Sequence, residues 1–358
     1  MYIKNLKLKN YRNYSFLNLD LVNGINIIYG DNAQGKTNIL EAIYMSSTTK
    51  SYKQAKDKEI IKFGEEEAHI KTIYIKNEKE NTIDIHIKNN KNKGIAVNGK
   101  KINKISDFFG LTNTIIFAPE NLYIIKEGPN LRRKFLDFYI SQIDKIYINN
   151  LSNYNKILNQ RNILLKNIVY NKSDKNELEI WDKQLILYGK LIIKKRKEII
   201  EELKKEIYEK HLFISSNTEK LITEYEYNVD EKDFEKKLKD NIEQDIKYQT
   251  TQIGPHRDDI RFIINDVDIR KYGSQGQQRT AALSLKLAEL SSIKKIKQDN
   301  PVLLLDDVFS ELDLIRQKLL VEYIKDIQVI ITVTGLTKEL IEELKPQKMY
   351  QIKNAQII

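Results

Sequence analysis

The segment Gly30–Thr37 constrains the fold of this chain more than any other stretch. It reads Gly30-Asp31-Asn32-Ala33-Gln34-Gly35-Lys36-Thr37 and fits the pattern G-x-x-x-x-G-K-[ST]. An apolar strand is expected before it at Ile25–Tyr29, and a helix is expected to follow from Asn38. This order predicts a phosphate loop, in which backbone N–H groups and the helix N-terminus surround nucleotide phosphates. We expect all eight residues to contact nucleotide, with Lys36 on the β- and γ-phosphates and Thr37 on Mg²⁺.

A second apolar run, Pro301–Leu305, ends in the acids Asp306 and Asp307. Such a run predicts a buried parallel strand, and open α/β sheets bind ligands at the carboxyl ends of their strands. Asp306 is suited to hold the Mg²⁺ shell through water, and Asp307 to orient or deprotonate the attacking water. Lys36, Asp306 and Asp307 are therefore the predicted catalytic residues, with Glu311 as the alternative to Asp307.

The turn Gly273–Arg279 precedes a predicted amphipathic helix from Thr280 to about Ile296. Its residues Ser274, Gly276 and Gln277 could cap the helix, or they could bind an anion at the positive end of the helix dipole. Because the turn lies upstream of the Asp306 strand, it resembles the signature motif of ABC-type ATPases. That resemblance implies a nucleotide held between two copies of the chain.

Composition limits the remaining possibilities. The chain has 358 residues, which favours two lobes, and no cysteine, which excludes disulfides and thiolate metal sites. Its formal charge of +10 favours an anionic partner such as nucleic acid, and a lysine-rich composition throughout the chain is the alternative explanation. The four histidines are scattered, so no metal is expected beyond nucleotide-bound Mg²⁺. Without a signal peptide or a membrane-spanning run, we expect a soluble, cytoplasmic protein.

The hydrophobic patterns divide the chain into three zones. Residues 1–128 are mostly strand and contain the phosphate loop, 129–250 are mainly helical, and 251–358 return to strand and helix. The sequence therefore predicts an α/β ATPase lobe made from N- and C-terminal segments, with a mainly helical second lobe inserted between them. Within the long helix expected at Glu177–Tyr208, the basic stretch Lys194–Glu198 indicates a solvated face. The strands predicted in the first zone are Tyr2–Leu8, Phe16–Leu21, Ile25–Tyr29, Ala68–Ile75, Thr82–Lys88 and Ile95–Val97, with a turn at Asn98-Gly99.

From end to end, the chain resembles the RecF family of DNA-repair ATPases, whose ATPase lobe is an ABC-type P-loop fold similar to SMC heads. The number of residues between Thr37 and Ser274 is too large for a typical transporter subunit and too small for an SMC protein with its coiled-coil arm. The motifs that carry the resemblance are Leu8–Tyr14, the phosphate loop, Phe117–Glu120, Gly128–Asp137, Gln160–Asn162, Gly254–Asp259, Ser274–Arg279 and Leu303–Asp313.

The resemblance implies a protein that dimerises on ATP, binds gapped DNA or single/double-strand junctions, and helps RecO and RecR load RecA. ATP with Mg²⁺ would be both cofactor and slow substrate, and DNA would stimulate the weak ATPase. A transporter nucleotide-binding subunit is the alternative, but it needs a membrane partner and a Q-loop glutamine that we do not find. An overcoming-lysogenization-type nuclease would need an additional acidic metal-binding domain.

Several positions depart from the superfamily pattern or have open roles. Thr332 or Thr334 stands where many ABC-type ATPases have a switch histidine, and Glu120 is our candidate for the Q-loop position. Arg12 resembles the nucleotide-side arginine of SMC-like heads, although a surface role is an alternative. His256 either touches ligand or only shapes a turn.

The predicted DNA contacts are basic residues near the helical lobe. Arg132, Arg133 and Lys134 begin a helix, where cations oppose the helix dipole and an anion could compensate; an ordinary solvated triplet is equally compatible. Arg257 is the further candidate. Such phosphate contacts would make binding salt-dependent and largely independent of sequence.

Overall fold

A computed structural model describes all residues of the chain, Met1–Ile358. They form two compact units. Unit 1 comprises Met1–Leu122, Phe213–Asn217 and Ala282–Ile358, and unit 2 comprises Tyr123–Leu212 and Thr218–Ala281. Unit 1 is thus assembled from the two ends of the chain, with unit 2 inserted in sequence. None of the helices is both long and apolar enough to cross a membrane.

Residues 251–281, which we assigned from the sequence to the ATPase lobe, belong instead to unit 2. The reason is strand pairing. Strand β10 (Asp259–Ile264) pairs antiparallel with β9 (Leu221–Glu226), and β11 (Val267–Asp268) adds to the other edge of β10. A three-stranded sheet therefore ties this segment to the preceding helical region.

The central sheet of unit 1 has the strand order β15-β14-β3-β13-β12-β8. Strands β3, β8, β12, β13 and β14 run parallel, and β13 and β12 are buried along their whole length. Both faces of such a strand pack against other parts of the protein, so successive residues are all apolar. This explains the uninterrupted apolar runs in the sequence. The bounds are β3 Ile25–Tyr29, β8 Thr114–Phe117, β12 Val302–Asp306, β13 Val329–Val333, β14 Lys348–Lys353 and β15 Gln356–Ile357.

The second sheet of unit 1 is an antiparallel meander with the order β2-β1-β4-β5-β6-β7. Strands β4 and β5 alternate buried and partly exposed residues, as expected for a sheet with one packed face. The Asn98-Gly99 turn is confirmed: both residues have positive φ, and Val97 pairs directly with Lys100. The bounds are β1 Tyr2–Tyr11, β2 Tyr14–Asp20, β4 Glu67–Lys76, β5 Lys79–Lys88, β6 Gly94–Val97 and β7 Lys100–Lys101.

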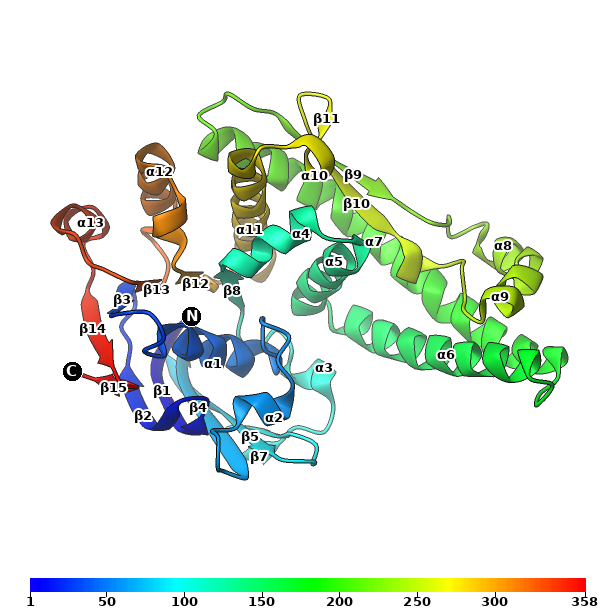
Figure 1. Cartoon of the computed structure of the whole chain (residues 1–358), viewed down its shortest axis with the longest axis horizontal. Coiled ribbons are helices and arrows are strands. Elements are labelled where there is room, and N and C mark those ends of the chain that lie inside the picture. Colours follow the sequence, from blue (N-terminus) through cyan, green and yellow to red (C-terminus); the bar gives the residue numbers. More distant parts are fainter. The chain divides into compact units, whose positions relative to one another are not determined.

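The helices of unit 1 connect these strands (Figure 1). The longest that lies wholly within unit 1 follows the phosphate loop, packs against β8 and β12, and is buried for most of its length. The helices are α1 Lys36–Thr48, α2 Asp57–Ile60, α3 Ile105–Phe108, α12 Leu314–Ile324 and α13 Lys338–Leu344, while α4 Leu122–Lys126 begins at the unit boundary.

Unit 2 is mainly helical, and its long helices α6 and α7 are prominent in Figure 1. Helix α11 (Gln275–Lys297) starts in unit 2 and continues into unit 1, beginning five residues before the predicted Thr280. The remaining helices are α5 Pro129–Ile143, α6 Lys145–Val169, α7 Leu178–Ile214, α8 Phe234–Asp240, α9 Ile242–Tyr248 and α10 Ile269–Tyr272.

Arginines form the polar centre of unit 2. Arg196 lies within the stretch predicted to be solvated, yet it is only 2% exposed. Its guanidinium donates to Asp258 at 2.8 Å and to Asp137 at 2.7 Å, and it also reaches the Pro255 carbonyl at 2.6 Å. The solvated-face prediction is therefore wrong for Arg196, because carboxylates on other segments satisfy its charge inside the unit.

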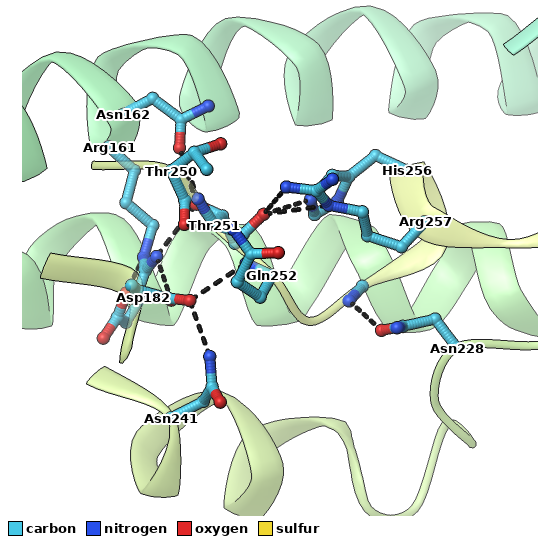
Figure 2. A network of polar contacts seen from close by, with 12 residues as sticks. Arg161, Asn162, Asp182, Asn228, Asn241, Thr250, Thr251, Gln252, His256 and Arg257 are labelled. Atoms are coloured by element: carbon cyan, nitrogen blue, oxygen red, sulfur yellow. Dashed lines mark hydrogen bonds and ion pairs between the residues drawn. The ribbon is translucent and has the colours of Figure 1, made fainter. Parts of the chain in front are cut away.

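A second buried network surrounds Arg161 (Figure 2), which donates to Asp182, Asp245 and Thr251 at 2.6–2.8 Å. The Thr251 carbonyl is in turn hydrogen-bonded to Nε2 of the His256 ring. The other ring nitrogen, Nδ1, lies 2.6 Å from the Tyr154 hydroxyl. Burial lowers the pKa of His256 to about 4. His256 therefore links α6 to the turn before β10 as a neutral, structural group.

We predict that His256 makes unit 2 sensitive to acid. Between pH 6.5 and about 4, an unfolded histidine gains a proton that the folded one does not, so the free energy of unfolding falls by up to about 3 kcal/mol. His256→Gln should flatten this dependence. Urea denaturation at pH 7 and pH 5 measures it, and equal pH slopes in the two proteins would contradict the assignment.

Candidate nucleotide-binding site

The phosphate loop has the conformation that its glycines permit. Gly30 and Gly35 have φ of 146° and 107°, and Gly35 caps the N-terminus of α1. A Cβ on Gly30 would lie 2.3 Å from the Ile352 carbonyl oxygen, so the close approach of β14 also requires glycine. Lys36 is 7% exposed, and its Nζ donates to the carbonyls of Gly30 and Asp31 at 2.6 and 2.7 Å. The backbone carbonyls of the phosphate loop thus hold the ammonium group in place.

Asp306 lies at the end of β12, where parallel pairing brings it to the phosphate loop. Its Oδ1 accepts hydrogen bonds from Thr37 at 2.9 Å and from Thr332 at 2.7 Å, and its Oδ2 accepts one from Tyr52 at 2.8 Å. A threonine hydroxyl beside a carboxylate is the oxygen donor set that Mg²⁺ prefers. These residues fit a nucleotide-bound Mg²⁺: Thr37 would be a direct ligand, and Asp306 would hold the water shell of the ion.

Asp307 follows in a left-handed conformation with φ of 53°. Its backbone N–H donates to the carbonyl of Thr332 at 3.1 Å, and its carbonyl accepts from Ser310 at 2.7 Å. These bonds fix the backbone and leave the carboxylate at the edge of the sheet. Burial raises the pKa of Asp307, and the Asp306 charge adds to this, which makes its carboxylate a stronger base.

The structure shows where Thr332, Thr334 and Glu120 lie, the candidates for the switch and Q-loop positions. Thr332 is buried and commits its hydroxyl to Asp306, whereas Thr334 is exposed just beyond β13. Glu120 lies directly after β8, which pairs with β12, so it stands at the same sheet edge as Asp306. All three therefore border the site within unit 1.

Arg12 lies in the β1–β2 turn and is fixed by the phosphate-loop helix. Its guanidinium makes two hydrogen bonds to Glu41, at 2.9 and 2.7 Å, and one to the Glu59 carbonyl at 2.8 Å. Burial alone would raise the pKa of Glu41, but bonds from Arg12, Ser51 and Tyr11 outweigh it and the pKa is lowered. Arg12 is thus held beside the loop by an ionised partner.

A cleft of about 950 Å³ opens next to these residues. Arg12, Asn13 and Asn38 line it together with the apolar side chains of Ile61 and Phe63, and Phe63 is fully exposed. Asn13 also bridges the loop to α1, since it donates to the Gln34 carbonyl and accepts from Asn38. Sequence reasoning missed Phe63 and Tyr52, because neither belongs to a motif.

The predicted signature turn lies in unit 2. Ser274 Oγ accepts from the Gln277 N–H at 3.2 Å, while the Gln277 side chain accepts from the Ser274 N–H at 3.0 Å. This reciprocal pair is a capping box at the start of α11. Ser274 and Gly276 are both exposed, and a Cβ on Gly276 would meet only Ser274 Oγ, at an ordinary contact distance of 3.9 Å. The structure thus shows the helix cap and leaves the small residues of the turn accessible.

The burial of Arg132 contradicts its prediction as a DNA contact. Arg132 is 1% exposed and binds Asp259 through two bonds of 2.6 and 3.0 Å. Arg133 is partly buried and donates to the Asp258 carbonyl, and the exposed Arg257 donates to the Thr251 carbonyl. Lys134 is exposed. Arg132 and Arg133 therefore join α5 to the β10 region.

We predict that Asp307→Asn keeps ATP affinity within about twofold but slows hydrolysis at least 100-fold, because an amide cannot accept the water's proton. Lys36→Ala is the matched control and should lose ATP binding itself. Single-turnover assays and equilibrium binding separate the two effects. Unchanged turnover in Asp307→Asn would transfer the role to Glu311.

Comparison with known proteins agrees with this geometry. The family model described as RecF/RecN/SMC N terminal domain matches residues 2–357. The DNA replication and repair protein RecF of Lachnospira eligens is 51% identical, and that of Agathobacter rectalis 52%, each over 100% of this chain and 99% of the relative.

Solved structures give the same result. One described as the recombination mediator protein RecF-ATP in the RecFOR pathway is 39% identical with a TM-score of 0.91, covering 100% of this chain and 98% of that one. An SMC head bound to the C-winged helix domain of ScpA, 16% identical with a TM-score of 0.59 over 100% and 97% of the two chains, shares the fold alone. The predicted SMC-head-like ABC-type fold is confirmed, and the chain belongs to the RecF family of DNA replication and repair proteins.

Proposed function

We propose that this protein is an ATP-dependent DNA-binding protein of recombinational repair. The observation that carries the proposal is the Thr37–Asp306 hydrogen bond, which joins the phosphate loop to the acidic end of β12. ATP would place its phosphates in the loop, with Lys36 on the β- and γ-phosphates. Bound Mg²⁺ supplies charge neutralisation between those phosphates. The RecF-ATP structure of a relative supports ATP as the nucleotide.

Hydrolysis would proceed by attack of water on the γ-phosphorus. The bond to the bridging β–γ oxygen breaks, giving ADP and phosphate, while Asp307 orients the water and accepts its proton. The cleft beside Arg12 suits the base and ribose, because Phe63 and Ile61 offer apolar contact and Asn13 and Asn38 offer hydrogen bonds. The reaction would be slow, because Thr332 and Thr334 stand where many ABC-type ATPases have a switch histidine and neither can act as a base. Hydrolysis would reset the DNA-bound state.

A second copy of the chain would complete the site. The exposed Ser274 and Gly276, at the N-terminus of α11, are suited to bind the γ-phosphate held by the partner's phosphate loop. ATP would then join two copies around DNA at gaps or single/double-strand junctions, and DNA would stimulate hydrolysis. The pathway named for the solved relative supports RecO and RecR as partners, and through them RecA. A transporter subunit has no observation in its favour.

For DNA contact, unit 1 offers a cleft of about 540 Å³ lined by Lys56, Lys58, Lys88 and Lys91 together with asparagines. Lys88 is paired with Glu67 at 2.9 Å, and the one acid that lines the cleft, Asp57, is paired with Lys93. Lys56, Lys58 and Lys91 are exposed without an acidic partner. Such lysines suit phosphates of a nucleic-acid backbone, and we propose this basic cleft in place of Arg132.

The sandwich proposal is tested by Ser274→Arg. We expect the ATP affinity of a monomer to stay within about twofold, because the phosphate loop is untouched. The ATP-driven dimer should be lost, since a bulky side chain blocks the approach of the helix N-terminus to phosphate, and hydrolysis should fall with it. Light scattering and equilibrium ATP binding on the same samples measure both. A variant that still dimerises with ATP would reduce the turn to a helix cap.

The basic cleft is tested by replacing Lys56, Lys58 and Lys91 with alanine. We expect DNA affinity to fall roughly 10- to 100-fold. The slope of log affinity against log salt concentration should also become shallower, by an amount that corresponds to up to about three lost phosphate contacts. A matched control replaces Lys318, Lys325 and Lys338, which are exposed in unit 1 outside the cleft. Fluorescence anisotropy at several salt concentrations compares the two triples, and equal losses would indicate a general charge effect.

A further inference from the structure

The segment that follows α1 reaches back to the end of β12. Tyr52, within this segment, donates its hydroxyl to Asp306 Oδ2 at 2.8 Å. Its ring packs edge-on against Tyr44 of α1, with centroids 5.7 Å apart and planes at 86°. Tyr52 is therefore fixed both by its ring and by its hydroxyl.

The two oxygens of Asp306 have different partners. Oδ1 accepts from Thr37, the predicted Mg²⁺ ligand, and from Thr332, whereas Oδ2 accepts only from Tyr52. Asp306 is 5% exposed, so water offers little replacement for a lost donor. The terminal torsion of an aspartate is soft, and without the bond at Oδ2 only the two bonds at Oδ1 restrain the carboxylate. The Tyr52 hydroxyl therefore completes the set of bonds that fixes the plane of the Asp306 carboxylate relative to Thr37.

The backbone around Tyr52 is itself anchored. The Ser51 hydroxyl donates to Glu41, the same carboxylate that binds Arg12, and Ser51 accepts from the N–H of Lys53 at 3.1 Å. One turn earlier, Thr48 Oγ1 donates to the Lys50 carbonyl at 2.9 Å.

We infer that Tyr52 is a positioning residue for Mg²⁺-dependent ATP hydrolysis: its hydroxyl orients the Asp306 carboxylate toward Thr37 and the metal's water shell. The inference rests on the proposed role of Asp306, and it adds a residue that lies outside the phosphate loop, the acidic strand and the signature turn.

The test removes one oxygen. In Tyr52→Phe, we expect ATP affinity in EDTA to stay within about twofold, because no phosphate contact changes. The Mg²⁺ concentration for half-maximal hydrolysis should rise roughly tenfold and kcat should fall by a similar factor, as expected for a lost bond to a buried charged group. Tyr44→Phe is the matched control, since it removes a hydroxyl from the same aromatic pair without touching Asp306. It should leave the Mg²⁺ dependence unchanged.

A double-mutant cycle shows whether Tyr52 acts through Asp306. The readout is the factor by which Mg²⁺ improves ATP affinity. Asp306→Asn should reduce this factor, and adding Tyr52→Phe should change it no further. Additive effects, or a wild-type Mg²⁺ dependence in Tyr52→Phe, would overturn the inference and leave Tyr52 a packing residue.

Should Tyr52→Phe prove unstable by thermal unfolding, Ser51→Ala serves as the second variant. It loosens the same segment and should shift the same Mg²⁺ readout by several-fold, and no shift would again overturn the inference. Failure of the underlying function is separately visible, because wild-type protein would then lack Mg²⁺-dependent ATP binding.

Discussion

The parallel pairing of β3, β13 and β12 is the constraint on which the site of unit 1 depends. Ile28 and Tyr29 of β3 pair with Thr332 and Val333 of β13, and Thr332 pairs with Asp306 of β12. Because parallel strands end at one edge, this register brings the phosphate loop within hydrogen-bond distance of an acid 269 residues away in sequence. A shift of one residue would turn Asp306 to the opposite face and remove the metal site.

The charged residues divide into two roles. Arg132, Arg161 and Arg196 lie inside unit 2 with carboxylate partners, where the planar guanidinium makes several directed bonds at once. Lysines such as Lys56 and Lys58 lie at the surface of unit 1. Buried arginine pairs contribute little net stability, but the loss of one partner is costly because a charge is left uncompensated. The net charge of +10 therefore overstates how many arginines are available to an anionic partner.

Around the phosphate loop, side chains from outside the motifs complete the arrangement. Glu41 joins Arg12 to Ser51, and Tyr52 continues from Ser51 to Asp306. The turn carrying Arg12 and the segment carrying Tyr52 are thus both tied to α1, the helix that begins with Lys36. This arrangement places the two flanks of the site on one rigid helix, as precise positioning of phosphate and metal requires.

The sequence by itself determined the phosphate loop, the Asp306 strand and most strands of unit 1, because each depends on local pattern: glycines with positive φ, uninterrupted apolar runs and period-two alternation. It also gave helix capping as one of two alternatives for Ser274, beside anion binding. Only the tertiary structure decided that Arg132 and Arg196 are buried, that residues 251–281 join unit 2, and that Tyr52 binds Asp306. Each of these depends on a partner distant in the chain. A basic residue has the same local pattern whether it contacts water or a carboxylate, so only the packing of distant segments decides between the two.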